Sequence, residues 1–420
     1  MKKTSTLTFA LLLTAGAGFA QNNDASLTQY GNNHEAQIEQ IGSANQAAAE
    51  VLGGNNSLLD IFQQGDGNTA TMEELRDNIQ AFQTQTGNDN TASISQARQN
   101  NTITQKQDGD NNTAGFTGHN IPSVRGGTYL QDQVGDGNTA VIEGANNKNV
   151  VTQTQVGDDN VATVRGSNFS DNTVTMEQTG NSNTAELYLP GSNWNYTRII
   201  QTGDDNIANA EQSGSSSDVW ITQSGDANQS DALHSGDGFI DQDQAGDENT
   251  AFARATSSAE ITQEQTGDNN TALAGKTRGG LNQNSSATQT QTGDANYAEI
   301  EIRQGNGRNN SFTQTQTGDE NRAYVLDAGN GNTTTQIQEG DGNLSKIGEM
   351  GNPQLGGMDV LTSQLGDDNQ AFVFGNGNDR AEILQTGDMN FGSITQLAGD
   401  DHAAISQTGN GNDATIMQNN

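Results

Sequence analysis

The chain contains no cysteine and only 3 prolines among its 420 residues. Without cysteine, no disulfide framework can hold the fold together, so hydrogen-bonded backbone and stacked side chains must supply the stability. Proline has no backbone N–H to donate, and its scarcity suits a structure in which nearly every N–H belongs to a ladder. These absences favour an extensively hydrogen-bonded β structure.

Basic and apolar residues are also scarce. The chain has 17 lysines and arginines against 52 acidic residues, a formal net charge of -35, and only 30% of its residues are hydrophobic. The acidic excess argues against nucleic-acid binding and against an anionic membrane surface. No run is long and apolar enough to predict membrane insertion. The composition resembles that of a disordered acidic chain, so any order must come from regular repetition.

Residues 1–20 have the features of a secretory signal peptide. Lys2 and Lys3 precede an apolar run over residues 7–13, and the small residues around Ala20 suit signal cleavage. We therefore expect a secreted, extracellular protein.

The remaining chain divides into a short N-terminal segment over residues 21–28 and a repeat array over residues 29–420. The period of the array is interrupted by irregular inserts near residues 115–128, 275–284 and 347–359.

The most informative feature is the unit Q-x-G-x-x-N-x-A, which recurs about every 22 residues along the chain. A fixed period of this length indicates one supersecondary unit stacked many times. We expect its members to form a structural ladder and assign them no catalytic, cofactor or metal role. The ladder positions are Gln85, Gly87, Asn90, Ala92, Gln96, Gln107, Asn112, Ala114, Gln155, Gly157, Asn160, Ala162, Gln201, Gly203, Asn206, Ala208, Gln265, Gly267, Asn270, Ala272, Gln407, Gly409, Asn412, Ala414 and Gln418.

Within each unit, every second residue belongs to one chemical set. Asn101, Ile103, Gln105 and Gln107 alternate with residues that suit a solvent face. Alternation with a period of 2 predicts strands, and no segment sustains the i, i+3, i+4 pattern of a helix. The expected fold class is all-β, a β-solenoid of stacked strand-turn-strand repeats that becomes cross-β on polymerisation.

Stacking in register would place equivalent strands ~4.8 Å apart. The interior Gln and Asn side chains would then form continuous amide ladders along the stack. Between the two strands of a unit lies a G-D-x-N turn, such as Gly203-Asp204-Asp205-Asn206. Gly, Asp and Asn tolerate the left-handed backbone that such a tight turn requires.

The ends of the array are as regular as its middle. Gln29–Gln40 and Gln407–Gln418 are regular half-units, and neither is followed outward by a distinct capping pattern. A solenoid end exposes a row of unpaired backbone groups unless something covers it. We therefore expect another copy of the chain to form the next layer.

These residues make the chain resemble the curlin repeat, the unit of bacterial curli amyloids, whose pattern is Q-x-G-x-x-N-x-A-x-x-x-Q. Residues 85–96, 201–212 and 407–418 match it in full, and residues 29–40 match with His34 in place of Asn. The resemblance implies a secreted subunit that forms a homopolymer, an adhesive fibre of the biofilm matrix. It also implies a nucleator subunit and an outer-membrane secretion pore as partners. The last repeat is regular and lacks basic residues, which favours the major, fibre-forming subunit.

A rival hypothesis is a monomeric, Ca²⁺-stabilised β-solenoid that acts as an adhesin or secreted binding module. Stacked turns would place the G-D-x-N aspartates in rows, and Ca²⁺ prefers oxygen ligands. Diffuse Ca²⁺ binding by these rows is one interpretation, and solvated turn carboxylates are the other. His34, His119, His234 and His402 show no metal-ligand spacing.

No catalytic motif is present in the sequence, and we predict that the chain is not an enzyme. Trp194, Tyr196 and Trp220 could form a carbohydrate-stacking patch, but the favoured interpretation is that large residues fill irregular coils.

Overall fold

A computed structural model describes residues 22–118, 126–145, 148–275, 281, 283–302, 308–327, 329–348, 357–375, 378–397 and 400–419. The predicted signal peptide and His119 lie outside these residues, as do most residues of the predicted inserts. The described strands divide into two compact units, which meet in sequence between Asp171 and Asn172. None of the described segments forms a helix of the length and apolarity that a membrane crossing requires.

The first unit contains the strands β1 (Asp24–Gln29), β2 (Glu35–Ile41), β3 (Gln46–Val51), β4 (Leu58–Gln64), β5 (Thr69–Leu75), β6 (Gln80–Thr86), β7 (Thr91–Ser95), β8 (Thr102–Asp108), β9 (Thr113–Gly118), β10 (Thr128–Val134), β11 (Thr139–Ala145), β12 (Val150–Val156) and β13 (Val161–Phe169).

The second unit contains β14 (Thr173–Thr179), β15 (Thr184–Pro190), β16 (Tyr196–Thr202), β17 (Ile207–Ser213), β18 (Ser217–Ser224), β19 (Gln229–Ser235), β20 (Gly238–Ala245), β21 (Thr250–Thr256), β22 (Ala259–Thr266), β23 (Thr271–Ala274), β24 (Ser286–Thr292), β25 (Tyr297–Ile302), β26 (Ser311–Thr317), β27 (Arg322–Asp327), β28 (Thr333–Glu339), β29 (Leu344–Ile347), β30 (Asp359–Leu365), β31 (Gln370–Phe374), β32 (Arg380–Thr386), β33 (Phe391–Gln396), β34 (His402–Thr408) and β35 (Asp413–Gln418).

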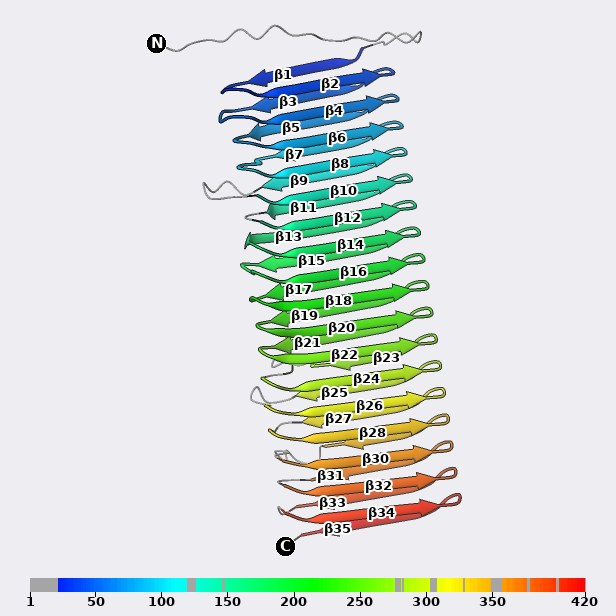
Figure 1. The fold of residues 1–420 in the computed structure, drawn as a ribbon. Coiled ribbons are helices and arrows are strands. Elements are labelled where there is room, and N and C mark those ends of the chain that lie inside the picture. Colours follow the sequence, from blue (N-terminus) through cyan, green and yellow to red (C-terminus); the bar gives the residue numbers. More distant parts are fainter. Residues whose placement is uncertain are drawn as a thin grey trace. The chain divides into compact units, whose positions relative to one another are not determined.

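Within each unit, strands pair in parallel with the strand one repeat away. Odd-numbered strands form one sheet and even-numbered strands the other, as in β17 with β19 and β16 with β18. The even-numbered strands of a unit all point the same way and enter the tight turns along one edge (Figure 1). The predicted all-β solenoid is therefore confirmed. Cross-β polymerisation remains a prediction.

The pairing keeps its register where the length of the repeat changes. Gln85 and Gln107 are 22 residues apart and bond directly, while the next pair in the same row, Gln107 and Gln133, is separated by 26. The separation is also 26 from Gln265 to Gln291 and from Gln338 to Gln364. These longer steps span the three predicted inserts, so the extra residues lie in connections and leave the strands aligned.

The two sheets enclose a thin interior built from alternate residues. In β26, Phe312, Gln314 and Gln316 are buried while their neighbours are not, and on the following strand β27 Ala323 and Val325 are buried. Small Ala side chains allow close approach of the sheets, and the aliphatic residues fill the remaining space. The predicted alternation is confirmed.

Each tight turn requires a glycine for two reasons. Gly225, between β18 and β19, has a φ of 110°, a region that L side chains rarely adopt. A Cβ on Gly225 would also lie 2.2 Å from the carbonyl oxygen of Gly246 in the next turn. The close stacking of successive turns therefore depends on glycine.

We expect Gly225→Ala to destabilise the layers formed by β18 and β20 by at least about 2 kcal/mol, since it adds both backbone strain and a clash. Amide hydrogen exchange of these two strands measures the loss. Gly331→Asn is the control, because Gly331 has a φ of 71° and a Cβ added there would meet no atom within 4 Å. Equal protection in the two variants would contradict the expected role of turn stacking.

Candidate functional site

One row of buried glutamines runs along the even-numbered sheet of each unit. In the second unit it is unbroken from Gln178 on β14 to Gln407 on β34. In the first unit the row runs from Gln40 on β2 to Gln155 on β12. In both units the amide Nε2 of each glutamine donates to the Oε1 of the glutamine one layer further along the chain.

The second N–H of each amide reaches the facing sheet. Gln223 donates to Gln244 Oε1 at 2.9 Å and to the backbone carbonyl of Ile207 at 3.0 Å. It also accepts a hydrogen bond from Gln201 at 2.9 Å. The row thus satisfies the buried amide completely and ties the two sheets together, which a buried polar group requires.

A row of asparagines supports the turns in the same way. The backbone N–H of Asn206 donates to Asn183 Oδ1 at 3.0 Å, and Asn206 Nδ2 donates to the carbonyl oxygen of Gly225 at 2.7 Å. At the other end of the strands, in the turn between β1 and β2, His34 Nδ1 accepts the backbone N–H of Ser57 at 3.2 Å, as Asn172 Oδ1 accepts that of Asn195 at 2.8 Å. The imidazole nitrogen therefore occupies the acceptor role of the asparagine oxygen.

The structure places most of the sequence-predicted ladder residues in these rows. The glutamines Gln85, Gln107, Gln155, Gln201, Gln265 and Gln407 belong to the even-sheet row, and Gln396 Nε2 donates to Gln418 Oε1 at 3.0 Å in the odd sheet. The asparagines and glycines lie in the tight turns, and the alanines face the interior from the following strands. Gln96 lies elsewhere: β7 ends at Ser95, and Gln96 has a φ of 55°.

A second amide row lies beside the first, formed by interior glutamines such as Gln105 that follow the predicted alternation outside the named ladder positions. Gln83, Gln105, Gln131 and Gln153 are bonded in series at 2.8–3.0 Å, and a second run extends from Gln242 to Gln336. The Q-x-Q spacing at the end of these strands is the sequence signal for it. In other layers the same position holds an aliphatic residue, such as Ile38, Ile221 or Ile405.

The turn aspartates form an exposed row along the edge of the stack. The backbone N–H of Asp226 donates to Asp247 Oδ1 at 2.8 Å, and that of Asp247 donates to Asp268 Oδ1 at 2.9 Å. The same contact repeats from layer to layer as far as Asn410. One oxygen of each carboxylate is thus engaged by backbone, which composition and spacing do not reveal. Among the described residues, no group of three or more acidic or histidine side chains could hold a metal ion.

Comparison with known protein families agrees with this geometry. The family model of the curlin-associated repeat matches residues 20–53, 54–97 and 170–214. The chain therefore contains curlin-associated repeats in these three segments. No curated protein matches it in sequence. The curlin repeat and the β-solenoid fold are structural rather than enzymatic, and the amide rows are the interior of that repeat.

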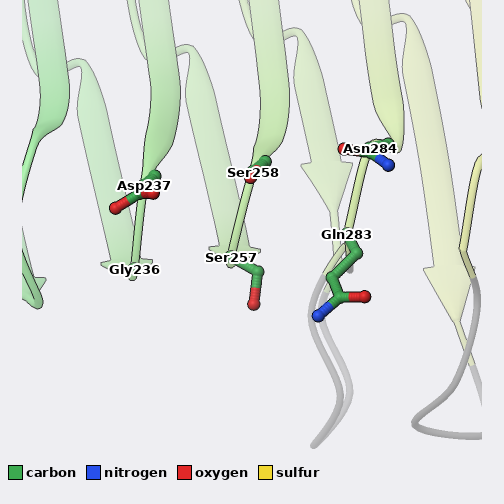
Figure 2. A pocket seen from close by; sticks show the side chains of 6 residues that line it. All are labelled: Gly236, Asp237, Ser257, Ser258, Gln283 and Asn284. Carbon is green, nitrogen blue, oxygen red and sulfur yellow. The ribbon is translucent and has the colours of Figure 1, made fainter.

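A shallow polar hollow interrupts one edge of the curlin array in the second unit (Figure 2). Its lining residues come from the turns before β20, β22 and β24. They are Gly236, Asp237, Ser257, Ser258, Gln283 and Asn284. Asp237 is the one ionisable side chain among them, so this hollow does not supply the acid and base pair that general acid–base catalysis uses.

Three aromatic side chains form a cluster on the outer face of the even-numbered sheet. Trp220 on β18 lies edge to face against Tyr196 on β16 and Phe239 on β20, with ring centroids 6.3 and 5.0 Å apart. The interpretation that these residues fill irregular coils is wrong for Tyr196 and Trp220, because both lie in regular strands. Trp194 is in the preceding turn and is exposed. Successive layers bring the rings together, although they are far apart in sequence.

One histidine occupies an interior position. His234 on β19 lies in register with Gln212 and Ala255 and is 2% exposed. Burial lowers the pKa of His234 from 6.5 to about 4, opposed by weaker effects of nearby backbone groups and of Asp237. The folded layer therefore prefers the neutral imidazole.

The amide row predicts that charged substitutions at two neighbouring residues will reduce protection from hydrogen exchange by very different amounts. Gln223→Glu removes an amide donor and places a carboxylate in the interior, so we expect a loss of about 3 kcal/mol in the protection of β18 and β20. Ser224→Glu adds the same charge one residue later, on the exposed face, and should change protection by less than about 0.5 kcal/mol. Hydrogen exchange at pH 7 compares the two. Similar protection would show that the amide row does not stabilise the stack.

The burial of His234 predicts that the stability of the layers around β19 depends on pH. Its pKa is lower in the folded state, so its contribution is fully present above pH 6.5 and is lost as the pH falls towards 4. The expected loss is roughly 3 kcal/mol for the layers around β19. Hydrogen exchange at pH 7 and pH 4.5 measures it, and the loss should be smaller in His234→Gln than in His402→Gln, since His402 is exposed. Identical pH dependence in these variants would contradict the assignment.

Proposed function

We propose that this curlin-repeat chain is a secreted structural subunit that polymerises outside the cell into amyloid fibres for adhesion and the biofilm matrix. In this proposal the copies stack end to end, so that each junction resembles the layers inside a copy. The partners are further copies of the chain, together with the nucleator subunit and outer-membrane pore that the family resemblance implies. The chain is the major, fibre-forming subunit.

The observation that carries this proposal is that the amide rows continue into the outermost layers, where interior side chains are only partly buried. The amide rows reach β34 and β35 without interruption, through Gln385 to Gln407 and Gln396 to Gln418. Interior-facing residues that are buried within the stack become partly exposed on β35, where Ala414 and Ile416 are examples. A further layer would bury these groups and extend both hydrogen-bonded sheets.

Parallel, in-register pairing of similar strands supports the same conclusion. This arrangement, with dry interior amide ladders, is the geometry of a cross-β fibre. Here it is built within one chain, which supplies many layers without an encounter between molecules. Growth of the fibre then requires new contacts only at the ends of each copy.

The rows of turn aspartates favour the rival, a monomeric solenoid stabilised by Ca²⁺. Carboxylates one layer apart repel each other, and a divalent cation would screen that repulsion. However, one oxygen of each carboxylate in the row already accepts a backbone N–H, as between Asp226 and Asp247. The neutral amide rows, rather than the carboxylates, connect the layers through the interior.

Fibre diffraction tests the proposal. The chain is purified unfolded and diluted into neutral buffer, once without Ca²⁺ and once with it. We expect oriented fibres with reflections near ~4.7 and ~10 Å in both buffers, the spacings of strands and of stacked sheets. A soluble monomer that becomes ordered only with Ca²⁺ would instead support the rival.

A further inference from the structure

The two sheets of the solenoid carry different side-chain orders in most layers but the same order at both ends. On β6 to β12 and on β20 to β28, the even-numbered strands have two interior glutamines after an apolar residue or threonine, as in Ile103, Gln105 and Gln107, whereas β14, β16 and β18 have one. The odd-numbered strand that follows has alanine and then an aliphatic or aromatic residue, as in Ala114 and Phe116. An odd strand could not replace an even strand in these layers without a mismatch of interior residues.

The first layer differs from this pattern. Its odd strand β1 presents Ala25, Leu27 and Gln29 to the interior side, after Asn23. Its even strand β2 follows with the equivalent residues Ala36, Ile38 and Gln40, after His34. Both strands therefore read Asn or His, Ala, aliphatic, Gln.

The last layers show the same half-repeat. The even strand β34 is reached through Asp401 and presents Ala403, Ile405 and Gln407. The odd strand β35 is reached through Asn412 and presents Ala414, Ile416 and Gln418. At both ends of the described array, the two sheets are thus chemically interchangeable.

The solenoid also rises by half a layer with each strand. β35 pairs with β33, while β34 pairs with β32. Among the described residues β35 is the later strand, so the next position on the rising spiral lies over β34 in the even-numbered sheet. A strand placed over β35 first would leave that position empty.

We propose that successive copies join head to tail with their sheets exchanged, an inference that rests on the proposed function. β1 of the incoming copy pairs with β34, and β2 of the incoming copy pairs with β35. The odd-numbered sheet of one copy therefore continues as the even-numbered sheet of the next.

The side chains at this junction match column by column. β34 and β1 bring Ala403 to Ala25, Ile405 to Leu27 and Gln407 to Gln29. β35 and β2 bring Ala414 to Ala36, Ile416 to Ile38 and Gln418 to Gln40. Each column places like beside like, as it does within the stack.

The glutamine amides at the junction also present a donor on one copy to an acceptor on the other. Gln40 uses its amide N–H groups on Asp24 O and Gln63 Oε1, so its own Oε1 is the acceptor that it presents to a new layer. At the other end, Gln418 donates one N–H to His402 O and accepts from Gln396. Its second N–H is the donor that the incoming Gln40 requires.

In the exchanged arrangement, the turn after β34 meets the turn after the incoming β1. At the position of the aspartate row, neither turn has a carboxylate. That row ends at Asn410, which accepts the backbone N–H of Asp388 at 3.0 Å. In the exchanged arrangement, Asn410 lies under Asn32, the corresponding residue of the first turn. Two neutral carboxamides thus meet where two charges would repel.

Stacking without exchange gives a poorer junction. Pairing β35 with the incoming β1 also matches like residues, but it separates β34 from the incoming β2 by two strand steps, ~9.6 Å. One strand position of the even-numbered sheet would then be vacant at every junction, with its backbone groups unpaired.

Cysteine cross-linking distinguishes the two junctions, because the chain has no cysteine of its own. Ser26 of the incoming copy lies opposite Ala404 in the exchanged arrangement and opposite Thr415 of β35 in the alternative, and all three are exposed. Paired Cα atoms ~4.8 Å apart lie within disulfide range. The test variant is Ala404→Cys with Ser26→Cys, and the matched control is Thr415→Cys with Ser26→Cys.

Fibres of each variant are verified by diffraction, oxidised, and analysed on denaturing gels without reductant. We expect covalent oligomers at least about tenfold more abundant in the test variant than in the control. A second pair, Ser406→Cys with Thr28→Cys against Met417→Cys with Thr28→Cys, repeats the comparison at another column.

Other outcomes overturn the inference. Cross-links confined to the control variants would show stacking without exchange. Fibres that diffract normally but cross-link in neither variant would show that these ends do not meet, while leaving polymerisation itself intact. Absence of fibres from the unmodified chain would remove the proposed function and the junction together.

Discussion

The buried carboxamide of glutamine is the group on which the rest of this structure depends. It carries two donors and an acceptor, and leaving one of them unpaired in a dry interior costs about 1–3 kcal/mol. An identical amide one layer away, together with a carbonyl of the facing strand, satisfies the group, as the contacts of Gln223 with Gln201, Gln244 and Ile207 show. That requirement imposes parallel pairing and an unshifted register, since a slip of one residue would turn every glutamine outward.

This interior explains how a chain with 30% hydrophobic residues can be ordered. Apolar burial is limited to a thin layer of alanines and single larger apolar residues, and polar groups are paired rather than excluded. Charge is placed at the turns and on the outer faces, where the aspartates of successive layers accept backbone N–H groups. Repetition therefore replaces the large apolar core that a globular protein of this length would need.

The same constraint connects stability with the proposed function. In a solenoid, the contact between layers within a chain and the contact between two copies are physically alike. The family supplies the expectation of fibres, and the structure shows end layers with partly exposed Ala414 and Ile416 below an uninterrupted amide row. In the first and last layers, both strands carry alanine, an aliphatic residue and glutamine on their interior side. Either sheet of one copy can therefore pair with either sheet of the next, which layers such as that of β8 and β9 would not allow.

The sequence by itself determined the fold class, the period, the alternation of the strands and most ladder residues, because side chains in stacked strands repeat with the chain. It did not determine which residues of different layers meet. The position of Gln96 after the end of β7, the cluster of Trp220 with Tyr196 and Phe239, and the burial of His234 depend on register and on where each strand ends. The half-layer offset of β34 and β35 likewise arises only when the chain is wound into a spiral, since it is a property of height along the stack rather than of any residue.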